Sequence, residues 1–267
     1  MLNISLSTGF LHTWDYREVL NIISQTKCSN IELFTSNYIN VPLIDLEREI
    51  IKNDLTVNSI HTPLDFLLRP DEDESYWILK CIEIAKTFGA KIITTHIVYI
   101  DKDGTDENVD DQHKRNLEMF ANNDIIVCTE NLPLKTSESQ KDSFLRRYTK
   151  LKEFITKTGV FMTYDTTHWA STNTSILDGY EYFKGHIRNI HLSDYRNGIE
   201  HMILGTGDIQ ITEFIKKLHD DDYSYPLTIE LDLESSERNS VNGKEQIIEA
   251  LNTSIQLVYD ALEQINE

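Results

Sequence analysis

The chain alternates about eight times between short β-prone runs and longer segments with helical spacing, and this alternation constrains its fold most. The predicted strands are residues 3–7, 30–34, 56–61, 91–97, 124–130, 160–165, 187–192 and 226–231. Between them, residues 75–90 and 143–159 carry apolar side chains at helical intervals and end near Gly89 and Gly159, which we expect to act as C-caps. The last helical segment covers residues 242–267.

Strands that alternate with helices imply parallel crossover connections. About eight such units in 267 residues are typical of an α/β protein built as a single (β/α)₈ TIM barrel, and we expect one domain over residues 1–267. The alternative is a doubly wound open sheet. It is disfavoured because no glycine-rich phosphate or dinucleotide fingerprint follows the first strand, where the sequence is STGFLHTW.

The composition limits which binding partners and cellular compartments we expect for this protein. A formal net charge of −19 repels nucleic acid and anionic membranes, which disfavours both as partners. Cys28, Cys81 and Cys128 lie far apart without metal-binding spacing, so we expect neither a disulfide framework nor a structural zinc module. The N-terminus lacks a signal-peptide pattern, and no run approaches eighteen apolar residues. We therefore expect a cytoplasmic protein.

Polar residues gather at the carboxyl ends of the predicted strands, which is where TIM barrels build their functional face. These residues are His61, His96, Glu130, Asn131, Asp165, His168, His191, Asp194 and Glu230, with His201 in the loop that follows the seventh strand. Any single histidine among them is readily explained as a hydrogen-bonded core residue. Five histidines beside several carboxylates are harder to explain in that way.

Carboxylates that converge in a barrel mouth repel one another, and burying them unpaired costs several kcal/mol each. A cation removes this conflict, and mixed oxygen and imidazole ligands favour Mn²⁺, Zn²⁺, Co²⁺ or Fe²⁺ over Mg²⁺ or Ca²⁺. We therefore expect Asp165 and His168 to be neighbours in a metal site. The alternative for Asp165 is a helix N-cap or an arginine partner. Glu32 is expected to line the barrel floor or hold another side chain rather than bind metal.

The stretch LGTGDI is predicted to form a turn before a helix. Gly205 and Gly207 are expected to supply positive φ angles, and Asp208 is expected to cap a helix that starts near Ile209.

The ordered motifs IELF, HTP, TEN, YDTTH, IHLSDYRNG, HMILGTGDI and IEL resemble the xylose isomerase-like barrel superfamily, which includes sugar isomerases, epimerases and endonuclease IV. Resemblance to tagatose and psicose 3-epimerases implies one divalent metal. From the ligand chemistry we expect Mn²⁺ or Zn²⁺ first, with Co²⁺, Fe²⁺ or Mg²⁺ after them. The implied ligands are Glu130, Asp165, His191 and Glu230. Glu130 and Glu230 would also act as acid and base, while His168, Arg196 and His61 would contact the substrate.

Resemblance to endonuclease IV implies more ligands for a three-zinc cluster. It adds His61, His96, His168 and His201 to the four residues above. One ligand of that pattern is missing, because Ile199 stands where an aspartate belongs, followed by Glu200.

The leading hypothesis is a metal-dependent isomerase or epimerase that acts on a sugar, sugar phosphate or related polyol through an enediolate. The first alternative is metal-dependent phosphodiester hydrolysis at abasic DNA, which the negative charge and Ile199 disfavour. The second is a barrel that binds metal or sugar without turnover. The sequence leaves the sugar, the metal and any homo-oligomer open.

Overall fold

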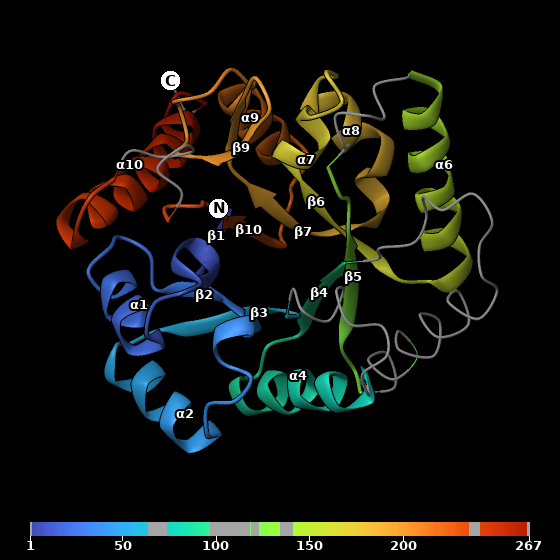
Figure 1. Cartoon of the computed structure of the whole chain (residues 1–267). Helices are drawn as coiled ribbons and strands as arrows, with labels where there is room; N and C mark the ends of the chain where they lie inside the picture. The colour runs from blue at the N-terminus through green and yellow to red at the C-terminus, as the bar shows by residue number, and fades with distance from the viewer. Residues whose placement is uncertain are drawn as a thin grey trace.

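The chain forms a closed barrel of eight parallel strands with helices outside it, as a computed structural model shows (Figure 1). The structure describes residues 2–63, 74–96, 118, 123–133, 141–234 and 241–265. The barrel strands are β1 Asn3–Ser7, β2 Asn30–Phe34, β3 Thr56–His61, β4 Ile92–His96, β5 Ile126–Glu130, β6 Phe161–Asp165, β7 Ile187–Leu192 and β10 Pro226–Ile229. They follow one another around the barrel in chain order, and β10 closes it against β1. The predicted (β/α)₈ TIM barrel is confirmed.

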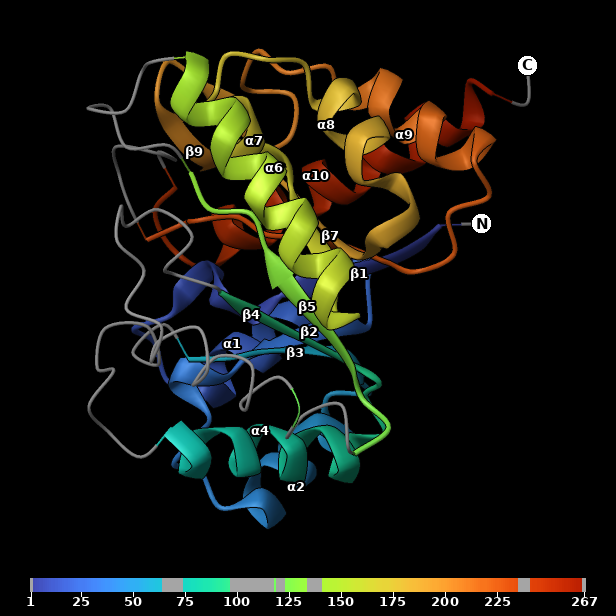
Figure 2. The same cartoon turned by 90° about the vertical axis from the view of Figure 1, so that its right-hand side faces the viewer.

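The helices form the outer ring. They are α1 Tyr16–Ile23, α2 Leu43–Lys52, α4 Glu74–Phe88, α6 Lys141–Thr158, α7 Thr166–Ala170, α8 Ile176–Phe183, α9 Ile211–Asp220 and α10 Lys244–Glu263, with short 3₁₀ turns η1 Thr8–Leu11, η2 Thr35–Asn37 and η4 Lys184–His186. Helix α4 packs on β3 and β4 (Figure 2), and α10 lies between α9 and α1. Gly89 and Gly159 follow α4 and α6 with φ of 71° and 73°, which agrees with the predicted C-caps. Among the described residues, no helix is long and apolar enough to cross a membrane.

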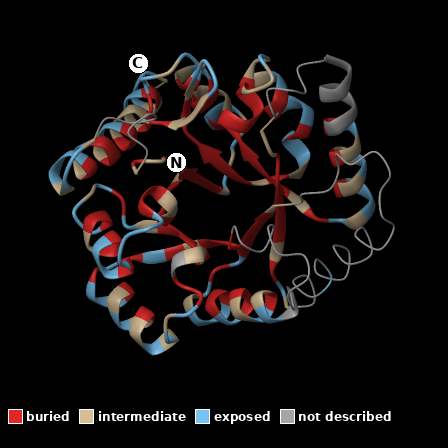
Figure 3. Cartoon of the chain, viewed as in Figure 1, coloured by how far each residue is buried: buried red, intermediate tan, exposed pale blue. Residues whose placement is uncertain are grey.

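The strands alternate between two faces, and almost all of their residues are buried (Figure 3). Outward residues such as Ile190 and Leu227 pack under the helices. Inward residues are mostly polar, and they meet across the barrel. The hydroxyl oxygens of Thr94 on β4 and Thr163 on β6 lie 2.7 Å apart, although these strands are not neighbours. TIM-barrel interiors are usually filled by branched apolar side chains, so this interior is unusual.

We call the inward residue at or next to the carboxyl end of each strand its upper position, and the inward residue two places earlier its lower position. The upper positions are Ser7, Phe34, His61, His96, Glu130, Asp165, His191 and Glu230. The lower positions are Ser5, Glu32, Ser59, Thr94, Cys128, Thr163, Asn189 and Thr228. The upper positions therefore carry the ionisable groups that the sequence places at strand ends.

A hairpin of β8 Asp194–Arg196 and β9 Ile199–Met202 follows β7. The Asp194 carboxylate organises the loop after it, because it accepts hydrogen bonds from the backbone N–H groups of Tyr195, Gly205 and Gly207 at 2.8, 2.9 and 2.8 Å. A Cβ atom at Gly207 would overlap this carboxylate, so a side chain is excluded there for lack of space.

Two expectations for this loop need correction. Gly205 has a φ of 82° as predicted, but Gly207 does not have a positive φ. Asp208 does not cap α9, which begins at Ile211 after Gln210. Its carboxylate pairs with the Arg196 guanidinium at 3.0 Å instead, because the loop folds back on the hairpin.

Candidate metal centre

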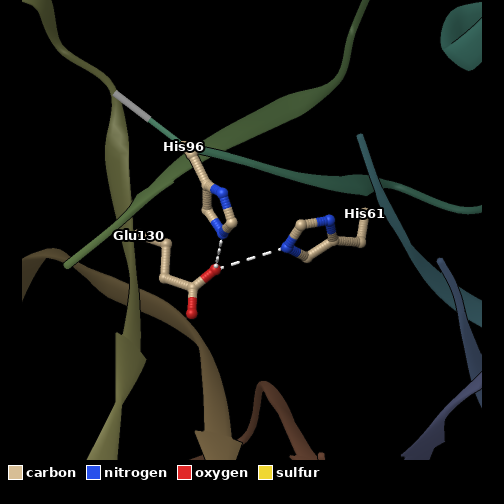
Figure 4. A group of neighbouring side chains, drawn as sticks. All are labelled: His61, His96 and Glu130. Atoms are coloured by element: carbon tan, nitrogen blue, oxygen red, sulfur yellow. Dashed lines mark hydrogen bonds and ion pairs between the residues drawn. The ribbon is translucent and has the colours of Figure 1, made fainter. Parts of the chain in front are cut away.

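Glu130, the last residue of β5, lies at the centre of the barrel mouth and is buried. One carboxylate oxygen, Oε2, lies 2.9 Å from His96 Nε2 and 3.3 Å from His61 Nε2, and Figure 4 shows both imidazoles converging on it. The other oxygen, Oε1, lies 3.2 Å from His191 Nδ1 and 3.3 Å from His168 Nδ1. Four predicted histidines, three from β3, β4 and β7 and one from α7, thus meet around one carboxylate.

His191 joins Glu130 to Glu230. Its Nδ1 atom lies 2.8 Å from Glu230 Oε2, and Glu230 follows directly after β10. Ligand atoms of Glu130, Asp165, His191 and Glu230 all lie within 4.8 Å of one another. These are the four residues that the resemblance to sugar epimerases nominates as ligands, and the fold brings all four together from β5, β6, β7 and the end of β10.

The hydrogen bonds of Asp165 show whether these four residues suit a bound cation. Its Oδ1 atom accepts the backbone N–H of His168 at 2.6 Å and the Thr167 hydroxyl at 3.0 Å, so Asp165 does cap helix α7. Its Oδ2 atom is buried and has no hydrogen-bond partner. A buried carboxylate oxygen without a partner is costly, and a metal ion is the kind of ligand that satisfies it. The capping and ligating interpretations of Asp165 are therefore compatible, since each uses one oxygen.

The pKa shifts in the site favour ionised glutamates beside a protonated His191. Burial by itself would raise the pKa of Glu130, but the neighbouring histidines, His191 foremost, outweigh it and hold that pKa well below its usual range. Burial and His191 act in the same opposed way on Glu230, whose pKa falls to about 2. Burial opposes the charged form of His191, yet the surrounding carboxylates raise its pKa well above the ordinary value. Without a metal, protons on histidines therefore balance the carboxylates.

The pKa values of His168 and His61 shift in the opposite direction to that of His96. Burial lowers the pKa of His168, but Asp165 and Glu130 outweigh it and raise the pKa to about 10. Burial also lowers the pKa of His61, but Glu130 outweighs burial and raises it. The pKa of His96 is lowered, because burial there exceeds the attraction of Glu130.

Three further groups of potential ligands overlap the first. They are His61 with His96 and Glu130, His61 with His191 and Glu230, and Asp165 with His168 and His201. His201 comes from β9, has a φ of 55°, and its ring lies 5.2 Å from that of His168. The mouth therefore offers more nitrogen and oxygen ligands than one ion needs.

A cavity of about 200 Å³ opens above these residues. Its walls are Gly9, His12, Phe34, His61, His96, Glu130, His168, His201, Glu230, Leu231 and Asp232. The predicted substrate contacts His61 and His168 line it. Arg196 does not, because its guanidinium is bound to Asp208 and to the carbonyl of Gly207 on the hairpin. Its substrate role stays a prediction.

Sequence reasoning passed over Gly9, His12, Phe34, Leu231 and Asp232 in this wall. Gly9, Phe34 and Leu231 carry no distinctive chemical signal, and only the path of the chain around the mouth brings them together with His12 and Asp232. It also passed over the role of Asn131, which binds the backbone of Asp165 in both directions, through Asn131 Oδ1 at 2.8 Å and Asn131 Nδ2 at 2.9 Å.

Comparison with known proteins identifies the class. Residues 21–256 match the family described as xylose isomerase-like TIM barrel, so the chain belongs to this family. An uncharacterized protein of Methanocaldococcus jannaschii is 26% identical over 94% of this chain and 96% of that protein.

Solved structures share the fold. The D-psicose 3-epimerase of Clostridium cellulolyticum H10, solved with D-tagatose, superposes with a TM-score of 0.73 and 11% identity, covering 98% of this chain and 99% of that one. The D-allulose 3-epimerase of a Methylomonas species gives 0.72 and 13%, covering 97% and 98%.

Proposed function

We propose that this protein is a divalent-metal-dependent isomerase or epimerase of a sugar, sugar phosphate or related polyol. The observation that carries the proposal is the buried group Glu130, Asp165, His191 and Glu230, in which Asp165 Oδ2 has no partner. The family and the fold shared with ketose 3-epimerases support it.

Glu130, Asp165, His191 and Glu230 would hold the metal, with Mn²⁺ or Zn²⁺ suited to their mixture of oxygen and nitrogen. When bound, a divalent cation supplies stabilisation of the negative charge that develops on a substrate oxygen. The rest of the chemistry belongs to the side chains.

Glu130 and Glu230 are the acid and base of the proposed reaction. One carboxylate removes the proton from the carbon next to the carbonyl, and the C–H electron pair becomes the C=C bond of an enediolate. The other carboxylic acid returns a proton to that carbon or its neighbour, so the substrate is rearranged without net loss of atoms. The low pKa values keep Glu130 and Glu230 ionised in the metal-free protein, so the one that acts as acid must first take up a proton.

His168 lines the cavity and is protonated at neutral pH, since its pKa is about 10. An imidazolium is a hydrogen-bond donor at both nitrogens, and its Nδ1 is used by the Asn131 carbonyl at 2.8 Å. The remaining nitrogen is therefore available to donate to a substrate oxygen.

The additional ligand groups favour a second candidate, a phosphodiesterase of the endonuclease IV type with several metals. Against it stand the net charge of −19 and Ile199 on β9, which offers no ligand where that pattern has an aspartate.

One experiment separates the candidates. Metal analysis of protein purified without chelator should give about one ion per chain for the epimerase and two or three for the hydrolase. Solvent deuterium incorporation into a panel of ketoses and aldoses is measured beside cleavage of an abasic oligonucleotide. Exchange without cleavage supports the proposal, cleavage without exchange replaces it with the hydrolase, and neither activity indicates a binding protein.

A further inference from the structure

Glu32 is a buried acid that the proposed reaction leaves without a role. It lies on β2, is 0% exposed, and is the only charged residue among the eight lower positions, all of which are described. The other seven are serine, threonine, asparagine or cysteine. A lone carboxylate below the mouth therefore needs a specific partner, because burying it unpaired costs several kcal/mol.

Two neutral donors hold one oxygen of Glu32. Oε2 accepts the hydroxyl of Ser59 at 2.7 Å and the Nδ2 amide of Asn189 at 2.8 Å. Asn189 is itself fixed, since its Nδ2 also donates to Thr94 Oγ1 at 3.1 Å and its Oδ1 accepts from Thr228 at 3.1 Å. The same Nδ2 atom lies 3.3 Å from His191 Nε2, which is farther than either of its two oxygen acceptors.

The other oxygen of Glu32 faces His191. Oε1 lies 2.9 Å from His191 Nε2, but no N–H points straight at it, so the contact is an ion pair and not an aligned hydrogen bond. The opposite nitrogen, Nδ1, faces Glu230 and Glu130 in the mouth. The ring therefore bridges the proposed metal group and Glu32.

We infer that Glu32 is a positioning residue, whose negative charge keeps the proton of the neutral His191 ring on Nε2 and so leaves Nδ1 free to bind the metal. The inference rests on the proposed metal-dependent function. Asn189 Nδ2 lies closer to Glu32 Oε2 and Thr94 Oγ1 than to His191 Nε2, and an amide nitrogen cannot accept a hydrogen bond. Glu32 Oε1, at 2.9 Å, is therefore the nearest acceptor for a proton on Nε2. A metal-bound imidazole ordinarily donates its second N–H to such a carboxylate, which fixes the tautomer and the ring orientation.

Glu32→Gln is the informative substitution. A glutamate offers two acceptor oxygens, whereas a glutamine offers one. Asn189 Nδ2 requires the acceptor at the Oε2 place, so the glutamine amide nitrogen faces His191 Nε2 and favours the tautomer with its proton on Nδ1. Glu83→Gln on α4, which removes an exposed charge paired with Lys80 at 2.8 Å, is the matched control.

Mn²⁺ affinity measured by titration calorimetry tests this prediction. We expect Glu32→Gln to weaken Mn²⁺ binding by about 10- to 100-fold and Glu83→Gln to change it by less than about twofold. Thermal unfolding without metal is recorded for each variant. If Glu32→Gln lowers the unfolding temperature but binds Mn²⁺ as the wild type does, Glu32 is merely structural and the inference is overturned.

The wild-type protein provides a second measurement that does not depend on the variant folding. In the Zn²⁺ form, long-range ¹H–¹⁵N spectra should show His191 protonated at Nε2 and bound through Nδ1, and the opposite assignment overturns the inference. Wild-type protein that binds neither Mn²⁺ nor Zn²⁺ overturns the proposed function together with this inference. Wild-type binding that Glu32→Gln leaves unchanged overturns this inference alone.

Discussion

The inward and outward faces of the barrel strands carry different kinds of side chain and have different roles. On β7, Asn189 and His191 point into the barrel, while Ile190 and Leu192 point out to the helices, and all four are 0% exposed. The outward residues join a continuous apolar core. The inward residues join a network of carboxylates, imidazoles, amides and hydroxyls that crosses the barrel.

This difference separates stability from chemistry within a single strand. Burying apolar area stabilises the fold at about 25 cal/mol per Å², whatever partner is found. A buried polar group stabilises only if its specific partners are met, and otherwise it costs free energy. The inward network is therefore the part of the barrel where a missing ligand has the largest consequences, and Asp165 Oδ2 is one buried atom in it that has no hydrogen-bond partner.

Removing the proposed acid or base should have the largest effect. Glu130→Gln and Glu230→Gln should each lower turnover by about 10²- to 10⁴-fold, because neither amide can exchange the proton. The rate of deuterium exchange into the active sugar measures turnover. Circular dichroism and cooperative unfolding should remain like those of the wild type, and retained turnover in either variant refutes that residue's role.

An outward substitution on β7 should have the reverse pattern. Ile190→Ala should reduce the free energy of unfolding by about 2–5 kcal/mol, because it leaves a cavity in the apolar core. Denaturant unfolding measures the loss. Mn²⁺ affinity of the folded variant should not change. If the affinity falls as well, the two faces are coupled and the comparison above fails.

The two roles of Asp165 can be divided by a pair of variants. Asparagine keeps an oxygen that caps α7 but loses the second carboxylate oxygen, whereas alanine loses both. Both should therefore lose Mn²⁺ binding, and Asp165→Ala should unfold about 1 kcal/mol more easily than Asp165→Asn. Calorimetry and denaturant unfolding of the metal-free proteins measure the two effects. Equal stability of the variants would show that the cap contributes nothing.

A charged group outside the barrel should give the smallest effect. Asp221 lies 2.6 Å from Lys184 Nζ and 2.9 Å from Lys217 Nζ at the molecular surface. Burial would raise the pKa of Asp221, but the two lysines outweigh it and lower the pKa. A carboxyl whose pKa is lower in the folded state stabilises above its unfolded value of about 4 and loses that contribution as pH falls.

Asp221→Asn should therefore lower the unfolding temperature by about 1–3 °C at neutral pH, because solvent weakens such pairs. Differential scanning calorimetry at several pH values measures the gap between variant and wild type. The gap should close toward acid pH. A gap that persists below the folded pKa would mean that packing, and not charge, is the cause.

The sequence by itself determined the barrel and the four proposed metal ligands at its mouth. Residues 30–34, 56–61 and 187–192 were predicted with the bounds that β2, β3 and β7 have, because alternation and turn residues are local signals. Parallel strands bring their carboxyl ends to one rim, so Glu130, Asp165, His191 and Glu230 could be expected to meet there without any knowledge of side-chain positions.

Only the tertiary structure decided which atoms face one another. Three contacts illustrate this, and each joins residues from different parts of the chain. Four histidines surround Glu130, Glu32 lies opposite His191 Nε2, and Arg196 pairs with Asp208 outside the cavity. Such contacts depend on the stagger of the strands around the barrel and on which donors neighbouring side chains have already used. Neither quantity is encoded in a local pattern, because each is set by the packing of the whole barrel at once.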